Sequence, residues 1–151
     1  MSKAVIILIV VGVLAAVLVG VLFFTMRDTN IVGVTTYPDR NTVVLCCKTG
    51  SEFVNGDGKI TVGEGEHLRL DHALKAGSFD LALYRGEDGL EPFRDVDMAN
   101  LPAPDAATDG VCGVSGVAGT GTLDLEVAPG TYMLLFTIHD TVGTATVTAE
   151  K

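Results

Sequence analysis

A run of 21 uncharged residues near the amino terminus, from Ala4 to Phe24, constrains this chain more than any other feature. An α-helix rises about 1.5 Å per residue, so a helix over this run is roughly 31 Å long. That length matches the hydrocarbon core of a bilayer, which is about 30 Å thick. The run therefore predicts an anchor over residues 1–27: a transmembrane helix that contacts the membrane through residues 4–25.

A cleaved signal peptide is the main alternative for this segment. Signal peptides have an apolar stretch of only about 7–15 residues, followed by a cleavage site made of small residues. Here the apolar run is longer, and it ends in Phe23, Phe24, Thr25 and Met26. The sequence therefore favours an uncleaved signal-anchor.

Charge is distributed unevenly about the apolar segment. Of the ten basic residues only Lys3 precedes it, whereas all nineteen acidic residues follow it, so the later part carries a net charge of −10. Such a surface repels nucleic acid, which excludes that class of partner. Counting of positive residues does not decide the orientation, because Arg27 and Arg40 lie on the other side. The few lysines and the strand-like pattern favour a cytoplasmic amino terminus and an extracytoplasmic domain in a single-pass protein of the cell membrane.

Small residues recur every four positions within the apolar segment, at Gly12, Ala16 and Gly20. This spacing places them on one helix face, where small side chains let two helix backbones approach closely. The face predicts self-association or packing on a partner helix. Chance is the alternative explanation, since such residues are common in apolar helices.

Beyond Met26 the hydrophobic period changes to two, which is the period of a β-strand. About eight or nine short segments have this pattern or are rich in β-branched residues: 31–37, 42–48, 51–54, 59–62, 67–71, 79–83, 123–127, 132–138 and 143–149. No amphipathic helix interrupts them. We therefore expect an all-β fold over residues 28–151, an antiparallel β-sandwich of jelly-roll type. The connection 85–121 is acidic and then glycine-rich, and it is predicted to be a long loop, either flexible or partner-binding.

Two pairs of segments in the domain resemble known bacterial sandwich domains. Residues 68–70 (LRL) and 77–84 (GSFDLALY) resemble a strand pair of bacterial surface sandwiches. Residues 128–136 (APGTYMLLF) and 143–148 (GTATVT) are similar to the closing hairpin of bacterial pre-peptidase C-terminal domains and of GOLD-like sandwiches. The resemblance covers roughly residues 66–150. It implies a non-catalytic accessory or interaction module, and it transfers no site residues to this chain.

The segment from Phe53 to Glu64 partly matches a calcium loop of the EF-hand type. Asn55, Asp57 and Glu64 are the candidate ligands, but Phe53 stands where the first aspartate is required. The flanks have strand character, and Asn55-Gly56-Asp57-Gly58 is also a strong hairpin turn signal. A turn therefore explains the same residues without a metal ion, and no metal or cofactor is expected.

Three cysteines, Cys46, Cys47 and Cys112, are candidates for a disulfide bridge. Adjacent residues of a strand point to opposite faces, so Cys46 and Cys47 are not expected to pair with each other. One of them can bridge to Cys112 in an oxidising compartment, and the other is then a buried apolar residue or an intermolecular thiol. Inert, buried thiols are the alternative.

No residue pattern of this chain indicates catalysis. The sequence GVSGV at 113–117 lacks the last glycine of a nucleophile elbow, and no histidine stands at a metal-ligand spacing. We therefore expect a non-enzymatic, membrane-anchored envelope protein whose β-sandwich mediates protein interaction or assembly. One alternative is a ligand- or calcium-binding module that uses the acidic loop and the 55–64 turn. Another is a subunit of a filament or complex with the apolar helix in its core.

Overall fold

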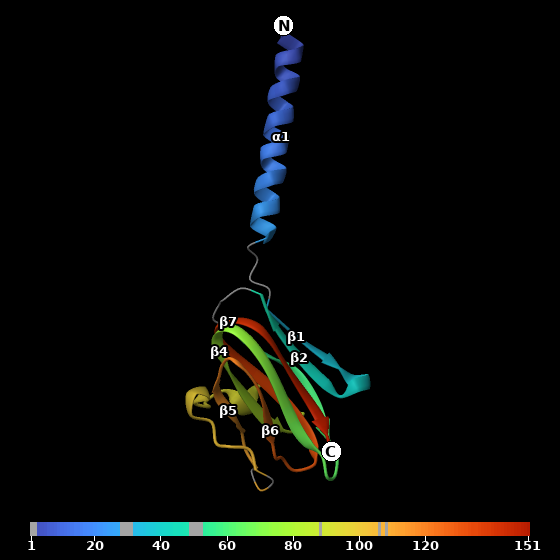
Figure 1. Ribbon diagram of the computed structural model, residues 1–151, viewed down its shortest axis with the longest axis vertical. Helices are drawn as coiled ribbons and strands as arrows, with labels where there is room; N and C mark the ends of the chain where they lie inside the picture. Colours follow the sequence, from blue (N-terminus) through green and yellow to red (C-terminus); the bar gives the residue numbers. More distant parts are fainter. Residues whose placement is uncertain (1–2, 28–31, 49–52, 88, 106, 108) are drawn as a thin grey trace.

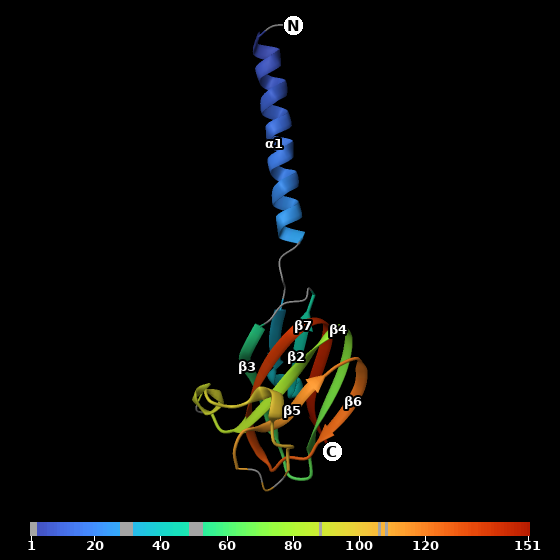
Figure 2. The ribbon, with the colours of Figure 1, turned by 90° about the vertical axis from the view of Figure 1, so that its left-hand side faces the viewer.

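The computed structural model describes residues 3–27, 32–48, 53–87, 89–105, 107 and 109–151, without the side chains of residues 20, 22–27, 32 and 53–57. Its first element is a long helix, α1 (Lys3–Arg27). This helix extends away from a β-rich domain that contains the rest of the described chain (Figure 1). A view turned by 90° shows the same separation (Figure 2).

The predicted transmembrane helix is not supported by the structure. Over the described residues, no helix combines the length and the hydropathy that are required to cross a membrane. This finding corrects the helical part of the predicted fold class and the predicted single-pass localisation in the cell membrane. The signal-anchor and the extracytoplasmic placement of the domain depended on that helix, and they lose their support with it.

The β-rich fold is confirmed, with seven strands among the described residues. The strands are β1 (Val32–Tyr37), β2 (Thr42–Cys47), β3 (Phe53–Val62), β4 (His67–Arg85), β5 (Cys112–Val117), β6 (Thr120–Leu125) and β7 (Gly130–Glu150). Three short 3-10 helices lie between them: η1 (Pro38–Arg40), η2 (Glu91–Phe93) and η3 (Met98–Asn100). All strand pairings are antiparallel.

Two long strands, β4 and β7, pair with each other along almost their whole length and belong to both halves of the sheet. In one half, β2 pairs with the end of β7 and β6 pairs with the start of β4. In the other half, β3 pairs with the start of β7 and β5 with the end of β4. Between the halves the register of β4 and β7 shifts twice, between Leu74 and Ser78. The sheet bends there, so that its halves form two layers.

A single hydrophobic core fills the space between the two layers. Leu70 and Val147 come from the half that contains β2 and β6, and Leu81 and Phe136 come from the half that contains β3 and β5. All four side chains are fully buried. Among the described side chains, none of α1 belongs to this core.

The connection between β4 and β6 is more ordered than the sequence suggests. Instead of a continuous loop over residues 85–121, it contains η2, η3 and the whole of β5. Phe93 of η2 packs with Ala82 and Leu135 in a second apolar cluster on the outer face of the sheet. Its ring meets that of Tyr84 edge to face, with 6.3 Å between centroids. The connection therefore covers one face of the domain.

Candidate functional site

Helix α1 carries most of the exposed large apolar side chains of the described chain. Its apolar run contains no proline and no charged residue, so nothing interrupts the helix or gives it a polar face. Large side chains are exposed on every side of it, including Ile7 (63%), Leu8 (78%), Leu14 (64%) and Leu18 (65%). Neither hydrophobic cluster of the domain includes a described side chain of α1. We call residues 4–21 of α1 the apolar helix surface.

The predicted helix-packing face lies within this apolar helix surface. Gly12 and Ala16 are exposed, and a Cβ atom built on Gly12 meets no atom within 4 Å. The surroundings of Gly20 lie outside the described residues. Within the described part, the small residues therefore leave space along the helix and contact no other part of the same chain.

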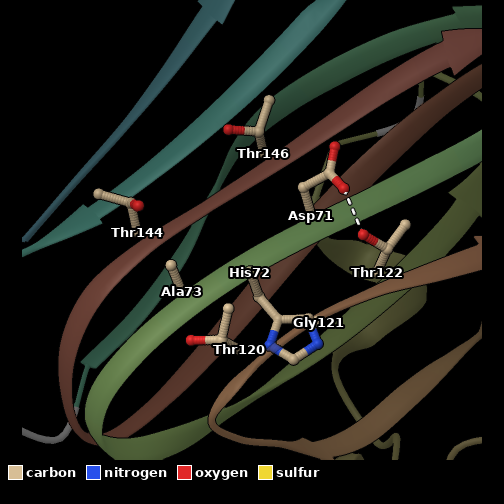
Figure 3. Close-up of a pocket in the computed structure, with 8 residues that line it drawn as sticks. All are labelled: Asp71, His72, Ala73, Thr120, Gly121, Thr122, Thr144 and Thr146. Carbon is tan, nitrogen blue, oxygen red and sulfur yellow. Dashed lines mark hydrogen bonds between the residues drawn. The ribbon is translucent and has the colours of Figure 1, made fainter.

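A shallow hollow of about 300 Å³ lies on the outer face of the sheet, where β4 passes between β6 and β7 (Figure 3). Its lining is mostly hydroxylated: Thr120, Thr122, Thr144 and Thr146, together with Asp71, His72, Ala73 and Gly121. The threonines face outward because strand residues alternate between faces, with Ala145 and Val147 of β7 in the core.

Asp71 is the charged group of this hollow, and its partners hold it in place. The Thr122 hydroxyl donates a hydrogen bond of 2.7 Å to Oδ1 of Asp71 (Figure 3), and Nε of Arg69 lies 3.1 Å from the same oxygen. These hydrogen bonds hold the pKa of Asp71 below its ordinary value, and the hydrogen bond from Thr122 contributes most. Arg69 also donates to Glu150 over 3.3 Å, and hydrogen bonds to both carboxylates raise its pKa. The charged groups at the hollow thus have partners within the protein.

His72 faces the interior and has a structural role. Its Nδ1 donates to the carbonyl of Gly119 over 2.9 Å, and the backbone N–H of Leu74 donates to the same carbonyl. The ring is buried beneath Gly121, where an added Cβ atom would approach Nε2 to 3.2 Å. His72 thus fixes the turn between β5 and β6. Across the described residues, no cluster of three or more His, Cys, Asp or Glu side chains is suited to hold a metal ion.

A second polar network lies at the bend of the sheet, around the buried Asp80. Its Oδ1 accepts a hydrogen bond of 2.7 Å from the N–H of Gly116, and its Oδ2 lies 2.9 Å from Nε2 of His139. The buried Thr141 hydroxyl donates to the carbonyl of Ser78 over 2.5 Å. The sequence places His139 beside Asp140, but its carboxyl partner is 59 positions away in the chain. No local pattern signals that pairing.

The predicted calcium residues are not brought together as a loop. Strand β3 continues through Asn55 to Gly58, with a shift of register in place of the expected hairpin turn. The side chains of Asn55 and Asp57 lie outside the described residues, and Glu64 is exposed beyond the end of β3.

All three candidate disulfide cysteines are free thiols in the structure. Cys47 and Cys112 are buried in the main core, whereas Cys46 lies half-buried on the opposite side of β2. Burial, and to a lesser extent the nearby Cys46, raises the pKa of Cys47 to about 11. Burial, and to a lesser extent the charge of Asp105, also raises the pKa of Cys112.

Comparison of the chain with family models, curated proteins and solved structures found no significant match. The resemblance to pre-peptidase C-terminal and GOLD-like sandwiches therefore stays a prediction. Among the described features, the apolar helix surface is the one that intramolecular contacts leave exposed, whereas the polar clusters are satisfied internally.

Proposed function

We propose that this protein is a non-catalytic assembly subunit, in which the apolar helix surface packs against further copies of the same chain and the β-domain is displayed outside. The observation that carries the proposal is the exposure of the large side chains of α1, which reaches 78% at Leu8. Soluble monomers rarely expose large contiguous apolar patches, and such patches mark interaction sites.

The absence of a polar face favours an assembly of more than two copies. A helix of 25 residues is about 37 Å long, and with a diameter of about 10 Å its lateral surface is about 1,200 Å². One neighbouring helix covers at most about half of that, roughly 600 Å², which is less than the roughly 800 Å² per partner of a standard interface. A helix that is apolar all round is usually buried on all sides. Several neighbouring helices around α1 provide both an interface of sufficient area and burial on all sides.

The β-domain suits the role of a displayed head because its core is independent of the helix. Within the described part of the chain, both hydrophobic clusters consist of residues from the domain alone. In water, burial of apolar area drives helix association, at about 25 cal/mol per Å². The domain therefore has no need of α1 for its own core, and α1 remains available to other copies.

The test compares the purified full-length chain with a chain that begins at Val32, by analytical ultracentrifugation over a range of concentrations. We expect the full-length protein to form discrete or growing oligomers, and the shortened chain to be a folded monomer. Leu14→Glu places a charge within the apolar helix surface and is expected to weaken assembly strongly, because an unpaired buried charge is costly.

Leu90→Glu is the matched control, since Leu90 is also an exposed leucine (54%) but lies in the domain. It should leave the oligomer size unchanged. A monomeric full-length chain at all concentrations, or an equal response to both substitutions, would contradict the proposal. An oligomeric shortened chain would assign assembly to the domain instead.

A further inference from the structure

In any assembly that encloses the helix, the apolar helix surface favours association of the copies, whereas the negative charge of the domain opposes it. The part of the chain after the apolar segment carries a net charge of −10. Each domain is attached at the carboxyl-terminal end of its helix (Figure 1). If three or more copies associate through α1, at least two domains lie at the same end of the bundle, whatever the orientation of the helices. Association therefore places strongly acidic domains side by side.

The dimensions of the molecule keep these domains within reach of each other's charge. Packed helices are about 8–10 Å apart, whereas a compact domain of this size is about 35 Å across. The domains of neighbouring copies are therefore in contact or nearly so. The screening length in water is about 30 Å at 0.01 M salt and about 3 Å at 1 M. Charge repulsion between domains is thus strong at the lower salt concentration and nearly absent at the higher one.

The excess negative charge lies on the surface and is not neutralised within the domain. Four basic side chains of the domain already pair with acidic ones, in Lys59–Glu87, Arg69–Asp71, Arg85–Asp109 and Arg94–Glu91. Other acidic side chains remain exposed without an ion pair among the described residues: Asp39, Glu64, Asp95 and Glu126.

We infer that ionic strength regulates the assembly of this protein: repulsion between the acidic domains holds copies apart at low salt, and screening by cations allows the apolar helix surfaces to pack. The inference rests on the proposed function and names its regulation. It requires no specific cation site, because screening acts on the net charge of the whole domain.

The experiment measures oligomer size of the full-length chain by analytical ultracentrifugation in KCl at about 0.01 M and about 1 M. We expect the protein concentration at half-assembly to fall at least tenfold at the higher salt. A variant with Asp39→Asn, Glu64→Gln, Asp95→Asn and Glu126→Gln removes four negative charges from the domain. It should assemble at low salt at a concentration at least several-fold lower than the original chain.

A matched variant with Asp39→Glu, Glu64→Asp, Asp95→Glu and Glu126→Asp keeps the charge, and it should behave as the original chain does. It therefore controls for effects of the substitutions other than the loss of charge, whereas the amide variant separates charge repulsion from a general effect of salt on apolar burial. Equal assembly at both salt concentrations, or a salt response that the amide variant does not reduce, would overturn the inference and leave the proposed function standing. No assembly at either concentration would instead overturn the proposed function.

Discussion

The side-chain amide of Asn41 pairs with both backbone groups of Thr61, as a neighbouring strand would. The N–H of Thr61 donates to Oδ1 of Asn41 over 2.9 Å, and Nδ2 of Asn41 donates to the carbonyl of Thr61. Asn41 follows η1 with a positive φ of 47°, a conformation that asparagine tolerates better than most residues. One side chain thus joins the β1–β2 hairpin to the edge of β3.

Asn41→Gly should reduce the stability of the domain by about 1–2 kcal/mol, because it removes two hydrogen bonds but keeps the backbone free to adopt a positive φ. Urea denaturation measures this loss. Amide exchange at Thr61 should also become faster, since its N–H loses its partner. Asn100→Gly is a control in a different exposed turn, and it should leave exchange at Thr61 unchanged. Unaltered exchange in Asn41→Gly would show that the amide contact does not protect the edge of β3.

The bend of β4 depends on Gly77, which has a φ of 71° and lies against the opposite strand. A Cβ atom at this position would approach the carbonyl oxygen of Asp140 to 2.3 Å. Gly65 has a similar φ of 74°, but its Cβ atom would meet nothing within 4 Å. Gly65→Ala should therefore cost about 1–2 kcal/mol, the cost of a left-handed conformation alone. Gly77→Ala should cost at least about 2 kcal/mol more, because the backbone must move. Equal losses in urea denaturation would exclude a steric role for this close approach.

Local alternation predicts most strands of this domain but not their continuity. Residues 67–71 and 79–83 have the expected pattern, yet they belong to one strand, β4, that bends at Gly77. A glycine followed by serine resembles a turn in sequence, and only the pairing with β7 carries the strand through it. The strand β5 is missed for a related reason. It is rich in glycine, and Gly113 is needed because a Cβ atom there would clash with the carbonyl of Leu81.

The polar networks are less predictable than the strands. Asp80 and His139 are brought together by the register of β4 and β7, which no short segment encodes. By contrast, the sequence APGTY at residues 128–132 has a local explanation. The hydroxyl of the buried Tyr132 donates to the carbonyl of Ala128 over 2.6 Å and closes the turn before β7. Contacts between residues a few positions apart leave a pattern in the sequence, whereas contacts between residues far apart in the chain do not.

Cys46 should react with iodoacetamide at about pH 8 much faster than the other two thiols, since it is half-buried whereas Cys47 and Cys112 are in the core. A thiol reacts as the thiolate, and burial raises the pKa of Cys47 to about 11. Mass spectrometry of the native protein should show one rapid modification, and Cys46→Ser should abolish it. Two rapid modifications in the original chain would contradict the burial of the core thiols. The unfolded chain should react at all three positions.

Thr122→Val should raise the pKa of Asp71 towards its ordinary value, because the hydroxyl of Thr122 is the main cause of its lowering. A carboxyl group whose pKa is lowered by folding stabilises the protein above its unfolded pKa of about 4, and this contribution disappears as the pH falls through the folded value. The variant should therefore lose less stability on acidification than the original chain. Carbon-detected NMR titration of the carboxyl group measures the pKa directly. Thr144→Val lies in the same hollow without a hydrogen bond to Asp71, and it should leave the titration unchanged.

Asp80→Ala should destabilise the domain by about 2–4 kcal/mol, because it removes a buried carboxyl group that accepts from the N–H of Gly116 and pairs with His139. Asp80→Asn keeps the shape and one acceptor oxygen, so it should recover at least half of that loss. Asp124→Ala is the exposed control. Its carboxyl group lies 3.4 Å from His67 with 64% of the side chain exposed, and such contacts contribute at most about 1 kcal/mol. Urea denaturation of the three variants gives the comparison. If Asp80→Ala cost no more than Asp124→Ala, the network at the bend would contribute no more to the stability of the domain than an exposed ion pair does.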